Sequence, residues 1–167
     1  MMDIARSNFT RQKSRFDVVK KMIELGISVR NDEKLMIKDV HISDTALAKS
    51  INVDRRVVRD TVKQILANND LKKIFNKIQP VGTSLVEIAN LLGYSVLIIS
   101  ANPYEPGVIS DVSNALARNG LVIRQALADD PNTIDSAKLT LVIEGKVPSD
   151  IITKLRSLSC VDGITLK

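Results

Sequence analysis

The chain has 167 residues, of which 44% are hydrophobic and 26% are charged, a composition typical of folded globular proteins and not of disordered ones. Its longest apolar run, Val96–Ile99, is too short to span a membrane, and no basic segment leads into an apolar stretch at the start, so we expect a cytoplasmic protein. The single cysteine, Cys160, excludes an internal disulfide, and with His41 as the only histidine a zinc site is not expected.

The positive charge is concentrated in the first half of the chain. Residues 1–93 carry 17 Lys and Arg against 11 Asp and Glu, a net charge of +6, whereas residues 94–167 carry 7 against 8, a net charge of −1. A basic half beside a near-neutral half suggests a polyanion-binding module joined to a second domain, although solvated lysine-rich helices give the same excess. The low aromatic content, 3%, argues against a surface that stacks single-stranded bases.

The N-terminal segment begins with a helix and a hairpin. Apolar residues at helical spacing, from Phe16 through Val19 to Ile23, followed by Gly26, predict a first helix over about 10–25. Two short apolar segments, 27–30 and 35–38, are separated by four polar residues and predict a small β-hairpin.

Residues 43–66 carry signals for two helices joined by a sharp turn. Ser43 or Asp44 can cap a short helix that buries Leu47 and Ile51. Asn52 stands at the turn, where asparagine tolerates a left-handed backbone better than other non-glycine residues. The two helices therefore lie within 43–66, the second beginning after a further capping residue, Asp54.

The second of these helices separates apolar from basic residues. Val58, Val62 and Ile65 form one apolar stripe, which we expect to be buried. The basic residues outside that stripe are Arg55, Arg56, Arg59 and Lys63.

This segment resembles a DNA-binding helix-turn-helix. The resemblance implies that the second helix enters the major groove of double-stranded DNA, where Arg pairs with two acceptors of guanine. The alternative is a plain three-helix bundle whose arginines are only solvated.

The next segment predicts a fourth helix and then a linker helix. Leu71 to Ile78 reads as a short helix stopped near Pro80, with no glycine-turned wing after the second helix of the pair. Ser84 and Glu87 have capping-box spacing, and Gly93 ends the apolar pattern. We therefore expect a helix-turn-helix domain over 1–79, a linker helix over 80–93 and a second domain over 94–167.

The second domain contains an internal repeat of strand, helix and strand. We expect strands over 94–101, 121–128, 137–144 and 163–166, with helices over 107–119 and from Pro148. Two βαβ halves in one antiparallel sheet make the ferredoxin-like βαββαβ arrangement, so the predicted fold class is α+β.

The segment Pro106-Gly107-Val108-Ile109-Ser110-Asp111-Val112, which follows a strand, together with Asn119-Gly120-Leu121-Val122-Ile123, resembles an ACT domain. The whole chain resembles the archaeal predicted regulators of amino acid metabolism, a helix-turn-helix followed by ACT, and is similar in plan to the leucine-responsive regulators. The resemblance implies that an amino acid binds between two ACT units, held by this loop and by the partner's second strand. The matching positions, with the first helical amide added, are Asn102, Tyr104, Glu105, Gly107, Val108 and Val122.

Valine at position 122 departs from the family pattern, in which this strand residue is often a polar one such as asparagine. A backbone contact remains available there, but a side-chain hydrogen bond does not. The alternative interpretation is therefore an ACT unit that only dimerises.

We expect a transcription regulator that works as a homodimer or larger even oligomer, senses an amino acid, and has no enzymatic activity, metal or cofactor. All seven glycines lie at element ends and none makes a phosphate-binding loop. His41 has no catalytic partner cluster, Cys160 reads as a buried structural residue, and Asp129, Asp130 and Asp135 lack calcium-loop spacing. The alternatives are a regulatory subunit that docks on a biosynthetic enzyme through its N-terminal helices, and a DNA-binding dimer that senses no ligand.

Overall fold

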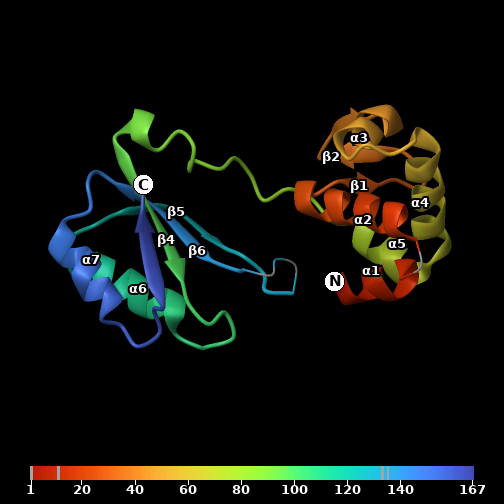
Figure 1. Ribbon diagram of the computed structural model, residues 1–167. Helices are drawn as coiled ribbons and strands as arrows, with labels where there is room; N and C mark the ends of the chain where they lie inside the picture. Colours follow the sequence, from red (N-terminus) through yellow and green to blue (C-terminus); the bar gives the residue numbers. More distant parts are fainter. Residues whose placement is uncertain (1, 11, 133, 135) are drawn as a thin grey trace. The chain divides into compact units, whose positions relative to one another are not determined.

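The computed structural model describes residues 2–10, 12–132, 134 and 136–167 and contains helices and two antiparallel sheets (Figure 1). The chain divides into two compact units, Met1–Gly82 and Thr83–Lys167. Within the described residues, no helix is both long enough and apolar enough to cross a membrane.

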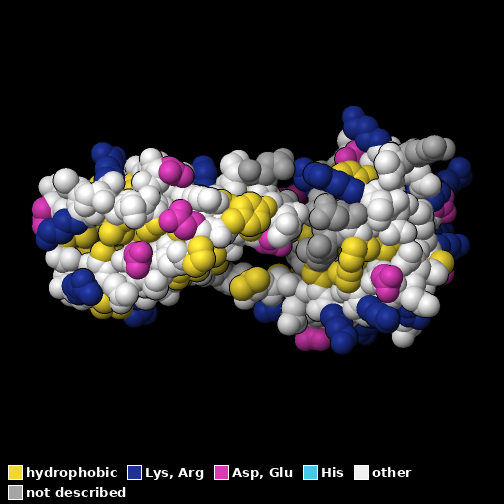
Figure 2. Space-filling model, turned by 90° about the horizontal axis from the view of Figure 1, so that it is seen from below, with side chains coloured by type: hydrophobic (Ala, Val, Ile, Leu, Met, Phe, Trp, Pro, Cys, Tyr) yellow, Lys and Arg dark blue, Asp and Glu magenta, His cyan; other side chains and the backbone are white. Residues whose placement is uncertain are grey.

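In the described residues of the first unit, five helices and a small sheet surround one core. Buried side chains from all five helices and from two of the strands make this core, with Phe9, Met22 and Phe75 among the largest. In the face drawn in Figure 2, Lys and Arg side chains lie around much of the outline of this unit. The elements are α1 (Met2–Phe9), α2 (Lys13–Leu25), β1 (Ser28–Val29), β2 (Leu35–Ile37), β3 (Val40–Ile42), α3 (Asp44–Ser50), α4 (Arg55–Ala67) and α5 (Asn69–Phe75).

The predicted first helix and hairpin are confirmed as α2 and the β1–β2 pair. Gly26 ends α2 with φ 64°, and its N–H donates to the Ile23 carbonyl at 3.2 Å. Two elements were not predicted. Helix α1 covers the core with the buried side chains of Ala5 and Phe9, and β3 follows a turn in which Lys38 has φ 52°, a conformation that usually requires glycine.

The linker helix predicted over 80–93 is wrong. The Gln125 side chain on β5 (Ile123–Ala128) accepts the Leu85 N–H and donates to the Thr83 carbonyl, both at 2.8 Å, and so holds the start of this segment in a non-helical conformation. The Ser84 hydroxyl accepts from Val86, at 3.3 Å, and not from the amide of Glu87 that a capping box requires. Tight turns and a short 3₁₀ helix, η1 (Asn90–Leu92), follow.

The second unit has the strand and helix order predicted from the sequence. Its sheet contains β5 together with β4 (Tyr94–Ser100), β6 (Leu139–Glu144) and β7 (Gly163–Leu166), in the antiparallel order β5-β6-β4-β7. Helices α6 (Val108–Ala117) and α7 (Ser149–Arg156) lie together on one face of this sheet (Figure 1). This is the split βαβ arrangement.

The two faces of the sheet are covered differently. On the helix side, Leu97, Ile99 and Leu155 are fully buried, and Cys160 is buried in the same core, as predicted. On the other face, Val96 and Val142 are buried beneath the turns of residues 83–93. The segment predicted to be a linker helix is therefore part of the sheet unit.

Candidate nucleic-acid interface and ligand site

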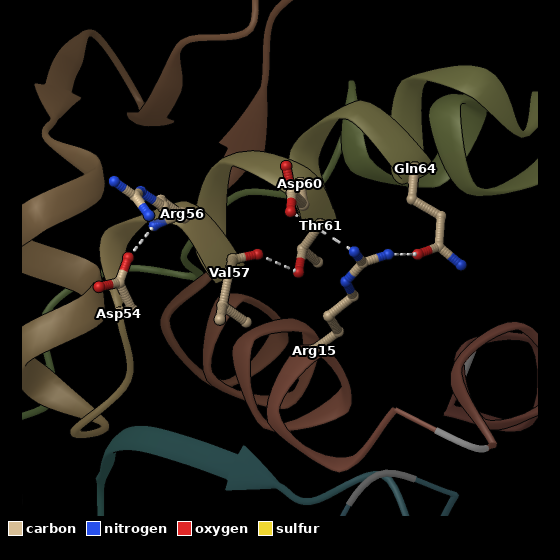
Figure 3. Close-up of polar contacts among 7 residues, drawn as sticks. All are labelled: Arg15, Asp54, Arg56, Val57, Asp60, Thr61 and Gln64. Atoms are coloured by element: carbon tan, nitrogen blue, oxygen red, sulfur yellow. Dashed lines mark hydrogen bonds and ion pairs between the residues drawn. The ribbon is translucent and has the colours of Figure 1, made fainter.

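The turn between α3 and α4 is built by the residues that the sequence marked. The Ser43 hydroxyl caps α3 by accepting the Ala46 N–H at 3.1 Å. Asn52 has φ 54° and makes the sharp turn. The Asp54 carboxylate caps α4 by accepting the Arg56 N–H at 2.7 Å (Figure 3). The position where α4 begins is therefore set by its own cap and turn residues, independently of tertiary packing.

The apolar stripe of α4 is buried, which confirms that prediction. Val58, Val62 and Ile65 are each at most 1% exposed. Thr61 is also buried, and its hydroxyl donates to the Val57 carbonyl at 2.7 Å (Figure 3). Because this side of the helix faces the core, the opposite side faces solvent, and the four predicted basic residues there are all exposed: Arg55, Arg56, Arg59 and Lys63.

A polar network from α1 and α2 braces the far half of α4. The Arg15 guanidinium donates to the Gln64 side chain at 2.8 Å and lies 3.5 Å from the Asp60 carboxylate (Figure 3). The Gln64 amide in turn donates to the Asn8 carbonyl at 3.1 Å. Asp60 lies on the exposed side of α4, as Arg56 does, and its negative charge would reduce the positive potential of that surface. The positive charge of Arg15 beside it partly neutralises this carboxylate.

Arg59 is exposed but not free. Its Nε atom lies 3.4 Å from the Asp44 carboxylate on α3, and the Arg59 side chain is 58% exposed. Asp44 and Arg59 line a pocket of about 200 Å³, and Lys34 and His41 line it too. The Lys34 ammonium hydrogen-bonds the Asp32 carboxylate at 2.8 Å and lowers the pKa of Asp32 below its ordinary value.

Chemically, the α4 surface suits binding of a polyanion. Exposed guanidinium groups on the first two turns of a helix have the reach to contact base edges in a major groove and the phosphates beside it. Lys73 on α5 has an acidic partner, as Arg59 does, because its Nζ lies 3.9 Å from the Asp70 carboxylate.

The second candidate site is a pocket of about 190 Å³ where the loop after β4 meets the hairpin end of β5 and β6. Gly107, with φ 100°, lies at the start of α6, whose first amides have no acceptor within the helix. Four of the six predicted ligand residues line this pocket: Asn102, Glu105, Gly107 and Val108.

The other two predicted ligand residues lie outside the pocket. Tyr104 is 71% exposed and Val122 is 51% exposed. The Val122 carbonyl accepts the Glu144 N–H, at the opposite end of the β5–β6 pair from Ala128. At ~3.3 Å per residue, that end is roughly 16 Å from the pocket, so one chain alone does not bring Val122 to it.

The pocket also contains residues that the sequence did not identify, Asp129 and Lys138 on the β5–β6 connection. The Asp129 carboxylate accepts the Lys138 N–H at 3.1 Å. The predicted strand order contained the signal for them, because it places the end of this hairpin beside the loop after β4. Asp135 lies outside the described residues, and no group of three or more potential metal ligands occurs among the described ones.

Comparisons with known proteins do not assign the chain to a family. No family model and no curated protein matches it. Similar solved structures include a homoserine dehydrogenase from Thiobacillus denitrificans, 14% identical over 68% of this chain and 28% of that one, with a TM-score of 0.36. The protein PH0061 is 13% identical over 91% of this chain and 87% of that one, with a TM-score of 0.28.

A transcriptional regulatory protein of the AsnC family from Pyrococcus furiosus is 7% identical over 92% of this chain and 85% of that one, also with a TM-score of 0.28. The chain spans less than a third of the homoserine dehydrogenase. These TM-scores are too low to carry a functional argument, which therefore rests on the sites.

Proposed function

We propose that the protein is a DNA-binding transcription regulator, acting as a homodimer or larger even oligomer, whose second unit is an ACT-type sensor of an amino acid. The observation that carries this proposal is the α4 surface: Arg55, Arg56, Arg59 and Lys63 are all exposed on a helix whose other side is buried in the core. The proposed role is binding without catalysis, and it uses no metal or cofactor.

The arginines of the first two turns are the proposed base-reading and phosphate-contacting residues. An Arg side chain pairs with guanine O6 and N7 in the major groove, and this pairing distinguishes guanine from the other bases. Lys63 lies two turns beyond the start of α4 and is proposed to contact a phosphate, because ammonium groups bind as point charges. The capped start of α4 and its brace through Arg15 support the role, since a rigid reader loses less entropy on binding.

The pocket beside Gly107 has the charges that an amino acid requires. The first amides of α6 offer donors to a carboxylate, and the lining residues include one cation, Lys138, and an acid, Glu105, that could pair with an ammonium group. Gly107 leaves space at the helix start, where an added Cβ would lie 3.7 Å from a side-chain oxygen of Asp111 and 3.9 Å from that of Ser110.

A second copy of the chain would complete this pocket. Strand β5 is an edge strand of its sheet, so its outer backbone groups are available for pairing. An antiparallel pairing of two β5 strands places the Val122 end of one copy beside the Ala128 end of the other, next to the pocket. Ligand at this interface would change the spacing of two α4 helices, which must match half-sites ~34 Å apart.

A thermal-shift screen of the full chain against the twenty amino acids tests the sensor. A ligand at about a hundredfold excess over its dissociation constant stabilises the folded state by ~2.7 kcal/mol. Gly107→Asp should abolish the shift. Gly120→Asp is the matched control, because it strains a positive φ in the same way but lies beyond the other end of α6, and it should retain the shift. No shift with any amino acid would favour a dimer that senses no ligand.

A pull-down separates DNA binding from the remaining alternative. A regulatory subunit of a biosynthetic enzyme would co-purify with that enzyme and would not be retained on a DNA resin. Retention on duplex DNA that is lost as salt rises is the result our proposal predicts.

A further inference from the structure

The contact between Asp44 and Arg59 bears on how α4 would read a sequence. Arg59 Nε lies 3.4 Å from Asp44 Oδ2, and the two side chains are 58% and 26% exposed. An ion pair this exposed adds little to stability. We propose that Asp44 is a positioning residue that orients Arg59 to read a guanine, an inference that rests on the proposed function and deepens it.

The geometry leaves the reading end of Arg59 available. A guanidinium carries five N–H donors on three nitrogens, and Nε is the nitrogen that lies nearest to the Asp44 carboxylate. Among the described residues, no other partner of the Arg59 side chain is recorded, so its two terminal nitrogens can donate to guanine O6 and N7. A carboxylate on the Nε side, as proposed, restricts the guanidinium while leaving its two terminal nitrogens unoccupied.

The position of Asp44 is itself fixed. It is the first residue of α3, directly after the capping Ser43, and α3 packs on α4 through the buried Leu47 and Ala48. Two packed helices thus hold the backbones that carry the carboxylate and the guanidinium at a set separation. An Arg side chain has many rotamers, and restricting them before binding reduces the entropy that must be lost on contact.

The pair carries a cost that a purely electrostatic surface would avoid. Asp44 places a negative charge beside a surface that is to face phosphates, which weakens attraction to any DNA. Arg55 and Arg56 have no recorded side-chain ion pair within the described residues and provide that general attraction. This division of roles predicts that Arg59 supplies sequence discrimination. Asp44 lowers the overall affinity for DNA but orients Arg59.

The experiment compares specific with non-specific binding by the full chain. A preferred duplex is first selected from random sequences by the unaltered protein, and each of its guanines is then replaced in turn. For the unaltered protein, one replacement should weaken binding by roughly 5- to 150-fold, the range of one bidentate Arg–guanine contact. Arg59→Ala and Arg59→Lys should lose discrimination at that position, because lysine keeps the charge but not the fork.

Asp44→Asn and Asp44→Ala should reduce the same discrimination at least ~5-fold while binding to unrelated duplex stays equal or becomes tighter, since a negative charge is removed. Asp70→Asn is the matched control, because Asp70 lies in the first turn of α5 and pairs with Lys73 at 3.9 Å. Thermal unfolding of each variant shows that it is folded.

Unchanged discrimination in both Asp44 variants would overturn the inference while leaving DNA binding intact. If Arg59→Ala keeps the full base preference, Arg59 is not the reader and the inference also fails. If the unaltered protein binds no duplex at all, the proposed function fails and the inference fails with it.

Discussion

Gly26 is the position where one added carbon should have the largest effect on the first unit. Its backbone has φ +64°, and a Cβ there would lie 2.4 Å from Pro80 N, 2.6 Å from Gln79 C and 2.8 Å from Pro80 Cα. All three atoms are backbone, so no side chain can rotate away. Gly26→Ala should cost ~1–2 kcal/mol for the left-handed conformation and ~1–3 kcal/mol for the overpacking, a loss of ~2–5 kcal/mol in the free energy of unfolding.

The matched control for this substitution is Gly120→Ala. Gly120 has φ +72°, and no atom lies within 4 Å of the position of its Cβ, so only the conformational cost applies there. Native-state hydrogen exchange of the α4 and α6 amides in the full chain follows each unit separately. If Gly26→Ala destabilises α4 no more than Gly120→Ala destabilises α6, the close approach of Gln79–Pro80 to Gly26 is refuted.

Three further predictions concern the α4 cap, the segment before the second sheet, and the phosphate contacts. Asp54→Ala should lower the urea midpoint of the first unit, corresponding to ~1 kcal/mol, with an unchanged slope, because it removes the 2.7 Å cap; an unchanged midpoint would contradict the cap. Gln125→Ala should speed hydrogen exchange of the Leu85 amide at least ~5-fold, since it removes two 2.8 Å bonds to that segment; equal rates would show that packing alone holds it. Lys63→Ala should reduce the magnitude of the negative slope of log affinity against log salt by ~0.9, equally for all duplex sequences. The control Lys20→Ala on α2 should leave that slope unchanged. An effect of Lys63→Ala that depends on the duplex sequence would argue against a phosphate contact.

The sequence predicted the α3–α4 turn well because its determinants are local. Ser43, Asn52 and Asp54 each act within three residues of their own position, so their roles follow from residue type and spacing. The strand and helix order of the second unit was likewise predictable, since its apolar periodicity is strong.

The errors arise where distant residues decide the structure. Ser84 and Glu87 have the spacing of a helix start, but Gln125, about forty positions later, takes the Leu85 amide and holds the segment against the sheet. The turn before β3 was missed because Lys38 adopts a positive φ without being glycine.

The site residues show the same division between local and distant determinants. Exposure of the four basic residues on α4 followed from helical periodicity. The pairing of Arg59 with Asp44 did not, because it depends on how α3 crosses α4. For the pocket, the sequence identified the loop around Gly107 but not Lys138, which the β5–β6 pairing brings to it.

The most direct test of the proposed DNA interface is binding of the full chain to duplex DNA across a range of salt concentrations. We predict that Arg55→Ala, Arg56→Ala and Arg59→Ala combined weaken binding at least ~10-fold and flatten its salt dependence. A control that replaces Lys20, Lys73 and Lys77 by alanine removes the same charge from other parts of the first unit and should bind nearly as the unaltered protein does. Equal binding by the arginine variant and the unaltered protein would contradict the assignment of DNA binding to α4.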